Sequence, residues 1–330
     1  MRILLLANQP EHTIRLKMFQ STLEELGYDT LIPKFNTRNW IQISGLAKQF
    51  IKKEKPDVIH IFNVPDIIYH DLSKLKGTYY KKMIYDYRSP WGIELEMNLG
   101  APSRVMAEYF EKKMATSADL ITTVNGPLGE KVKTYTENEK QEVYEVPNYP
   151  KNSFLTGEDL AEDGAITFLG RVCEQEGIGN FLNLAKKYPD EKFRIVGDGP
   201  FSKWHLAKKS PNVEFLGWQP HEKVAGIVKK ARICMIPRKE NNLTPYSTDK
   251  SIWKLNEYLN LGKLVIASGI TKEEDRKNLL IVKSSELENA VREYLDKKPE
   301  KLNSEDYRFW ESNTRKIKEV YEKIQSTTHQ

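Results

Sequence analysis

The sequence is poor in cysteine: Cys173 and Cys234 are the two that occur in 330 residues, and they lie far apart. They therefore offer neither the disulfide framework of a small secreted domain nor a cysteine-rich metal site. No apolar run reaches the roughly 20 residues of a membrane-spanning helix. The opening MRILLLANQP lacks a cleavage-site pattern, which favours a first strand over a signal peptide. We expect a cytoplasmic protein with reduced cysteines.

Patterns typical of metal and nucleic-acid sites are missing as well. No Asp-x-Asp pair occurs, and the six histidines lack the spacing of a metal-binding helix. A net charge of +5 without a concentrated Lys/Arg tract argues against a nucleic-acid partner. We therefore expect no metal, no cofactor and no nucleic acid. Small anionic ligands remain compatible, as does peripheral contact with the inner membrane face through the basic and aromatic segment 79–82.

Short apolar runs alternate with amphipathic stretches along the whole chain, which is the βαβ rhythm of a parallel sheet. The first series lies at 3–7, 29–33, 57–62, 82–87, 119–124 and 143–147. The rhythm restarts at about 160, with runs at 165–170, 192–197, 213–217, 232–237, 263–268 and 279–283. The sequence therefore predicts an α/β protein with two Rossmann-like domains.

The predicted domain boundaries follow from this restart. We expect a first domain over 1–150, a second over 151–305, and a terminal helix over 306–330. The exposed linker between the domains is PNYPKNSFLTGEDLAEDG, rich in proline, glycine and acidic residues. The terminal helix is amphipathic and needs an apolar surface, which the first domain could supply. Its predicted apolar face consists of Tyr307, Trp310, Ile317, Val320, Tyr321 and Ile324.

The pattern of segment 243–268 predicts a polar loop, followed by a helix and a strand. Asp249 is a helix N-cap type, and Gly262 is a natural stop before the strand. A helix that begins there exposes the backbone N–H groups of Lys250, Ser251 and Ile252, which suit a phosphate. Glu257 lies eight residues after Asp249, so both carboxylates can face one side and hold ligand hydroxyls. The alternative is an ordinary capped surface helix.

Two further loops of the second domain are suited to anion binding. Gly170 and Arg171 directly follow a predicted strand, where open α/β sheets bind ligands, and the next helix opens near Gly177. Arg171 would contact phosphate oxygens there, unless it is a surface arginine at a strand end. Gly197 follows another strand and permits close backbone approach to a ligand, or a plain turn.

In the first domain, Asp86 and Arg88 lie at the carboxyl end of the strand in YDYRSPW. Asp86 could accept a proton or orient a substrate hydroxyl. An Asp86–Arg88 pair that fixes a loop is an equally good interpretation. His12, in the first βα loop, is the histidine best placed for a ligand contact.

Together these segments resemble the retaining GT-B glycosyltransferases of family 4, also called glycosyl transferases group 1. GRVCEQEGIGNFL is similar to the family's Gly-Arg loop and helix, IVGDGP is a frequent family string, and DKSIWKLNEYLNLGKLVIAS is similar to its carboxylate-x7-Glu segment. The likeness implies two Rossmann-like domains facing across a cleft and a terminal helix that crosses back. It also implies a hexosyltransferase without a metal, acting with a UDP- or GDP-sugar and a glycan or lipid-linked acceptor.

By the same resemblance, Glu257 would bind the ribose and Asp249 the sugar hydroxyls. Arg171, with the amides of 250–252, would bind the diphosphate. Gly170, Gly197 and Lys254 would also belong to the donor-binding residues. Asp86 or Arg88 would lie near the reacting carbon.

The sequence departs from the family pattern at three places. Asp249 stands where the family prefers Glu, Glu176 replaces a second phosphate-binding Lys, and the first loop NQPEHT lacks a Gly pair. Either Lys250 or Lys254 compensates for Glu176, or donor binding is weaker. A sugar-nucleotide epimerase and a catalytically degenerate binding protein therefore stay open as alternatives.

Overall fold

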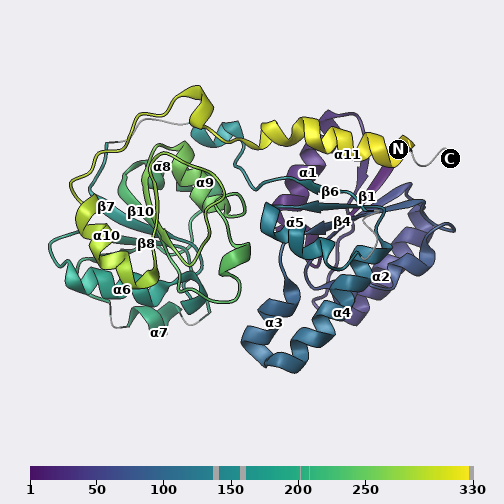
Figure 1. The fold of residues 1–330 in the computed structure, drawn as a ribbon, viewed down its shortest axis with the longest axis horizontal. Coiled ribbons are helices and arrows are strands. Elements are labelled where there is room, and N and C mark those ends of the chain that lie inside the picture. Colours follow the sequence, from purple (N-terminus) through teal and green to yellow (C-terminus); the bar gives the residue numbers. More distant parts are fainter. Residues whose placement is uncertain (137–140, 157–160, 201, 208, 327–330) are drawn as a thin grey trace. The chain divides into compact units, whose positions relative to one another are not determined.

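The computed structural model describes residues 1–136, 141–156, 161–200, 202–207 and 209–326. The chain forms two compact units. Unit 1 comprises Met1–Pro147 and Ser312–Gln330, and unit 2 comprises Asn148–Glu311. Each unit is an α/β body around one parallel sheet (Figure 1).

Unit 1 contains a six-stranded sheet in the order β2-β1-β3-β4-β5-β6, with every neighbouring pair parallel. Its strands are β1 (Arg2–Leu6), β2 (Asp29–Leu31), β3 (Val58–Phe62), β4 (Lys82–Tyr87), β5 (Leu120–Thr123) and β6 (Val143–Glu145). Its helices are α1 (Ile14–Glu25), α2 (Trp40–Glu54), α3 (Trp91–Leu99), α4 (Ala101–Ser117), α5 (Gly126–Lys133) and α11 (Thr314–Ser326).

Unit 2 repeats this design with the order β12-β11-β10-β7-β8-β9, again with parallel neighbours. Its strands are β7 (Ala165–Leu169), β8 (Phe193–Val196), β9 (Val213–Phe215), β10 (Ala231–Pro237), β11 (Leu264–Ser268) and β12 (Leu279–Ile281). Its helices are α6 (Ile178–Lys187), α7 (Ser202–Leu206), α8 (His221–Lys229), α9 (Trp253–Asn260) and α10 (Leu287–Tyr294).

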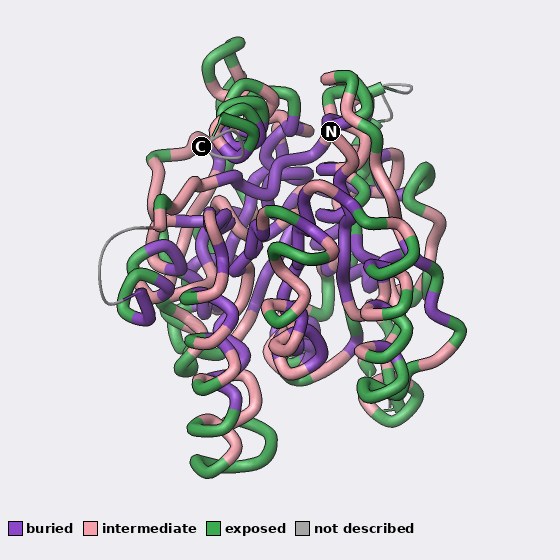
Figure 2. Tube along the Cα trace, turned by 90° about the vertical axis from the view of Figure 1, so that its right-hand side faces the viewer, coloured by how far each residue is buried: buried purple, intermediate pink, exposed green. Residues whose placement is uncertain are grey.

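The twelve predicted strands are all present, within a few residues of their predicted ends. Strand β10 shows why the sequence encodes them so clearly. Ile233 and Met235 pack into one core, with α6 and α10, while Cys234 and Ile236 pack into another, with α8 and α9. Successive side chains of a strand face opposite sides, so a strand covered on both faces is apolar throughout. Figure 2 shows buried residues concentrated on such central segments.

The last segment is not one helix from 306, as the sequence predicted. Trp310 belongs to unit 2, where its ring stacks on Trp253 and its backbone N–H donates to the Pro150 carbonyl at 2.9 Å. Helix α11 begins only at Thr314 and belongs to unit 1. Its buried face includes Tyr321, whose hydroxyl lies 2.7 Å from His60 Nδ1 on β3. Residues 327–330 of the predicted helix and 157–160 of the predicted linker lie outside the described residues.

Among the described residues, none of the helices is long and apolar enough to span a membrane. The segment 79–82 is partly exposed and partly packed: the Lys81 side chain is 61% exposed. Tyr80 is 2% exposed and its hydroxyl donates to the Leu72 carbonyl at 3.0 Å, while Lys82 opens β4.

Candidate functional site

The strand order of unit 2 reverses between β7 and β10, because β8 and β9 extend the sheet on one side and β11 and β12 on the other. In open α/β sheets, ligands bind beyond the carboxyl ends of the strands at such a switch point. Gly170 and Arg171 follow β7, and Arg238 follows β10. The sequence had assigned a role to the first two of these residues and not to Arg238.

Three charged side chains form the centre of this site, which we call the Glu176 cluster. Glu176 accepts a hydrogen bond from Lys254 Nζ at 2.6 Å and from Arg238 Nη2 at 2.9 and 3.0 Å. Glu176 lies in the 3-10 turn Glu174–Glu176, and Lys254 lies in the first turn of α9. The side chains of Glu176, Lys254 and Arg238 are 14%, 13% and 20% exposed. The cluster is therefore largely shielded from water but not sealed.

The charges of the cluster hold one another in place. Burial alone would raise the pKa of Glu176, but the charges of Lys254 and Arg238 outweigh it and lower the pKa to about 2. Burial lowers the pKa of Lys254, against the opposing effect of Glu176. Of the two lysines proposed to compensate for Glu176, Lys254 contacts it. Lys250 instead lies 3.6 and 3.7 Å from the carboxylates of Glu273 and Glu274.

Glycines let the surrounding loops approach one another. A Cβ on Gly170 would lie 2.8 Å from Lys254 Nζ, and one on Gly177 would lie 2.0 Å from the Pro237 carbonyl oxygen. A Cβ on Gly197 would lie 2.0 Å from the Gly170 carbonyl oxygen. Glycine at 197 is thus required by the packing of two loops, whereas the sequence had suggested either an approach to a ligand or a plain turn.

The helix predicted to start near Asp249 starts at Trp253 instead. Residues 249–251 form a turn, in which the Ser251 N–H donates to the Thr248 carbonyl at 3.0 Å and the Thr248 N–H donates to Ser251 Oγ at 2.8 Å. Such local side-chain bonds compete with helix formation. The prediction that the amides of Lys250, Ser251 and Ile252 open the helix is therefore wrong. The first-turn N–H groups are those of residues 253–255.

Asp249 does not occupy the predicted position. Its side chain is fully buried, and Oδ1 accepts the Glu273 N–H at 2.6 Å. Oδ2 is buried without a hydrogen-bond partner among the described residues, and burial raises the pKa of Asp249. Because Asp249 lies in a turn, its spacing to Glu257 no longer places the two carboxylates on one helix face. The expected contact of Asp249 with sugar hydroxyls is corrected accordingly.

Glu257 lies on α9, as predicted, and is 8% exposed. Its Oε1 is 3.1 Å from Nε2 of His221, the first residue of α8, and this hydrogen bond raises the pKa of His221. Lys254 and Glu257 are three positions apart, so they lie on one face of α9 with about 4.5 Å of helix rise between them. A cation and a carboxylate thus stand next to each other near the switch point.

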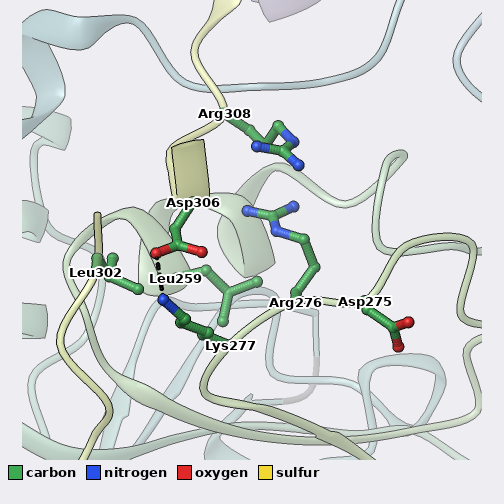
Figure 3. Close-up of a pocket in the computed structure, with 7 residues that line it drawn as sticks. All are labelled: Leu259, Asp275, Arg276, Lys277, Leu302, Asp306 and Arg308. Atoms are coloured by element: carbon green, nitrogen blue, oxygen red, sulfur yellow. Dashed lines mark hydrogen bonds and ion pairs between the residues drawn. The ribbon is translucent and has the colours of Figure 1, made fainter. Parts of the chain in front are cut away.

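Asn256 fixes the turn that precedes α9. Its Nδ2 donates to the carbonyls of Asn148, Asp249 and Ile252 at 3.1, 2.7 and 3.2 Å, and its Oδ1 accepts from Arg276 Nη1 at 3.0 Å. Arg276 lies in a small polar pocket, where its guanidinium faces that of Arg308 (Figure 3). The other lining residues are Leu259, Asp275, Lys277, Leu302 and Asp306, with Lys277 Nζ 2.8 Å from Asp306. Through Arg276 this pocket is linked to Asn256, but none of its lining residues belongs to the Glu176 cluster.

Asp86 is fully buried in unit 1, which contradicts its predicted role as a proton acceptor at a ligand. Its two oxygens accept from Arg15 Nε at 2.7 Å and Arg15 Nη2 at 2.8 Å, and Oδ1 also accepts from Thr122 Oγ1 at 2.6 Å. Burial alone would raise the pKa of Asp86, but Arg15 outweighs it and lowers the pKa. The ion-pair partner is therefore Arg15 from α1, and not Arg88.

Arg88 and His12 stay candidates for ligand contacts in unit 1. The half-buried Arg88 side chain donates from Nε to the Asn63 carbonyl, and burial lowers the pKa of Arg88. The His12 side chain is 71% exposed. The strand order of unit 1 reverses between β1 and β3, so the loop with His12 and the residues after Phe62 lie at this switch point.

Sequence reasoning missed Arg238, His221 and Arg15. Arg238 could have been found, because it directly follows a predicted strand, as Arg171 does. His221 and Arg15 had no such signal. Each acquires its partner through a contact between distant segments, Glu257 and Asp86 respectively.

Part of the sequence matches a known protein family, and the structure is similar to solved structures. Residues 163–297 match the family described as Glycosyl transferases group 1. The structure is similar to a sucrose-phosphate synthase from Thermosynechococcus elongatus, with a TM-score of 0.74, 14% identity and 99% of both chains covered. It is also similar to HepE from Anabaena, solved with UDP and glucose, with a TM-score of 0.62, 12% identity and 99% of both chains covered.

The curated sequences that match share less than a quarter of their residues with the chain over the aligned parts. The chain is 22% identical over 271 residues to a serine hydroxymethyltransferase of Staphylothermus marinus, which covers 78% of this chain and 57% of that protein. The chain spans about half the length of the curated relatives it matches. Identity at this level carries no activity over to the chain. The comparisons instead show that the chain has a GT-B fold and that its residues 163–297 match glycosyl transferases group 1.

Proposed function

We propose that the protein transfers a hexose from a UDP- or GDP-sugar to a hydroxyl of a glycan or lipid-linked acceptor. In this proposal the anomeric configuration is retained and no resident metal is needed. The observation that carries the proposal is the placement of Lys254 and Glu257 on one face of α9, near the switch point of unit 2. A nucleoside diphosphate presents the matching groups, namely phosphates for a cation and ribose hydroxyls for a carboxylate.

The proposed roles in unit 2 follow from this placement. Glu257 accepts hydrogen bonds from the ribose hydroxyls, and Lys254 faces the diphosphate together with the first-turn N–H groups of α9. The exposed Arg171 reaches the same phosphates from the loop after β7. These donors stabilise the negative charge that develops on the diphosphate as it leaves. HepE was solved with UDP and glucose, which supports UDP as the first nucleotide to test.

In unit 1 we propose that Arg88 and His12 contribute to the acceptor side. Arg88 supplies a positive charge near the carboxyl end of β4, and His12 offers an exposed imidazole in the loop after β1. Asp86 is left out of this assignment, because its carboxylate is saturated by Arg15 and Thr122.

Isothermal titration calorimetry with UDP and GDP tests the donor site. Glu257→Gln should weaken nucleotide binding by about 10- to 100-fold, since a hydrogen bond to a charged group contributes about 1.5–3 kcal/mol. Glu222→Gln is the matched control, because Glu222 is an exposed carboxylate on the neighbouring helix α8. Absence of nucleotide binding to the wild-type protein, or equal affinities for wild type and Glu257→Gln, would contradict the assignment.

Product analysis by NMR separates the possible reactions. Incubation of a panel of UDP- and GDP-sugars with candidate acceptors should yield a glycoside with the anomeric configuration of the donor, and chelation of divalent metals should leave the rate unchanged. Conversion of the donor sugar without an acceptor would indicate an epimerase. Nucleotide binding without turnover across the panel would indicate a binding protein.

A further inference from the structure

The Glu176 cluster contains an anion of its own. Lys254 and Arg238 both direct donor atoms at the Glu176 carboxylate, at 2.6 Å and at 2.9–3.0 Å. Charge-assisted hydrogen bonds from these two residue types to phosphate oxygens have the same length range. The carboxylate therefore fills a position that would equally accept a phosphate group.

The surroundings of Glu176 set it apart from Glu174, the other acidic residue of the same turn. Glu174 also lies in the 3-10 turn Glu174–Glu176, but its side chain is 59% exposed, against 14% for Glu176. The Glu176 side chain enters the cluster, while its backbone N–H donates separately to the Cys173 carbonyl at 3.1 Å. Rotation about the side-chain bonds can thus withdraw the carboxylate without breaking that backbone bond.

In the ligand-free protein, the two cations of the cluster need a neighbouring negative charge. Lys254 and Arg238 would otherwise place two positive charges next to each other in a poorly solvated position, which is unfavourable. Glu176 relieves this repulsion and leaves one net positive charge. A diphosphate would neutralise both cations, but an ionised Glu176 in the same place would repel it.

We propose that Lys254 and Arg238 are the residues that bind the donor phosphates, and that Glu176 holds their place in the ligand-free protein and moves aside when a phosphate enters. This inference rests on the proposed function, since it names residues of the same donor site. It adds Arg238 as a ligand and assigns to Glu176 the role of a competing internal anion. Glu176 thereby lowers the affinity of the site for anions and keeps the empty site stable.

Calorimetry with UDP and with inorganic pyrophosphate tests the inference. Pyrophosphate reports on the phosphate position without any contribution from base or ribose. Glu176→Gln keeps the size of the side chain but removes its charge, and should bind both ligands at least tenfold more tightly than wild type. Glu174→Gln, the matched control in the same turn, should bind like wild type. Arg238→Gln should bind pyrophosphate at least tenfold more weakly.

The outcomes distinguish this inference from the proposed function. Tighter pyrophosphate binding by Glu176→Gln, with no UDP binding by either protein, would support the phosphate position and contradict the nucleotide-sugar donor. UDP binding by wild type with equal or weaker binding by Glu176→Gln would overturn the inference alone. Should melting curves show that Glu176→Gln is unfolded, Arg238→Gln decides, and an unchanged pyrophosphate affinity in that variant would overturn the inference.

Discussion

Replacement of Asp86 by asparagine is expected to remove stability and not a catalytic group. The Arg15 side chain is 1% exposed and the Asp86 side chain is fully buried, so the variant leaves a buried guanidinium without its counter-charge. Removal of one partner from a buried ion pair typically costs about 3–5 kcal/mol. Asparagine keeps one oxygen for Arg15, and Arg15 Nη1 keeps its bond to the Val146 carbonyl at 2.7 Å, so we expect a loss near the lower limit, about 3 kcal/mol.

The corresponding fall in melting temperature is about 6–12 °C, because a domain of this size loses roughly 2–4 °C per kcal/mol. Differential scanning calorimetry measures it directly. Asp29→Asn is the matched control, since Asp29 forms an ion pair with Arg2 in which the side chains are 61% and 43% exposed. Such an exposed pair contributes at most about 1 kcal/mol. A double variant, Arg15→Met with Asp86→Leu, should regain part of the lost stability, because it removes both buried charges.

The pH dependence of this stabilisation has a defined sign. Arg15 lowers the pKa of Asp86 in the folded protein. The contribution of Asp86 is therefore fully present above the unfolded pKa of about 4, and is lost as the pH falls through the folded pKa. Wild type should lose its advantage over Asp86→Asn in strongly acidic solution. Unchanged melting of Asp86→Asn together with lost transferase activity would refute this reasoning and restore a catalytic role.

Two further variants probe the donor side of unit 2. The bond to Glu257 raises the pKa of His221, so their interaction is fully present below the unfolded pKa of about 6.5 and fades as the pH rises through the folded pKa. Protonated His221 therefore competes with the ribose hydroxyls for the Glu257 carboxylate, so UDP affinity in calorimetry should increase between pH 6 and 8.5 in wild type but stay level in His221→Gln. A level wild-type profile would contradict this competition. Gly177→Ala should cost at least 2 kcal/mol in urea denaturation, because φ is 84° and the new Cβ would lie 2.0 Å from the Pro237 carbonyl oxygen. Gly262→Ala, with φ at 70° and open space around the Cβ, should cost about 1 kcal/mol, and equal losses would argue against the close packing at Gly177.

The alternation of strands and helices along the chain could be predicted, because each strand or helix is encoded by a few consecutive residues. A strand such as 231–237 is covered on both faces, so its apolar character can be read from a few consecutive residues. The start of α6 near Gly177 could also be predicted locally, because the backbone of Gly177 is left-handed, a conformation that favours glycine. Arg171 and Glu257 could be found because they follow a strand or lie on a predicted helix.

The candidate site depended on contacts that no local pattern encodes. Arg15 and Asp86 are 71 positions apart, and Glu176 and Lys254 are 78 positions apart, so each pair forms only when the fold brings the distant segments together. The sequence by itself determined that this chain builds two parallel α/β units, because side-chain periodicity acts within a few residues. Only the tertiary structure decided which charges are buried as pairs and which remain near a ligand, because burial and charge pairing arise between segments that are distant in the chain.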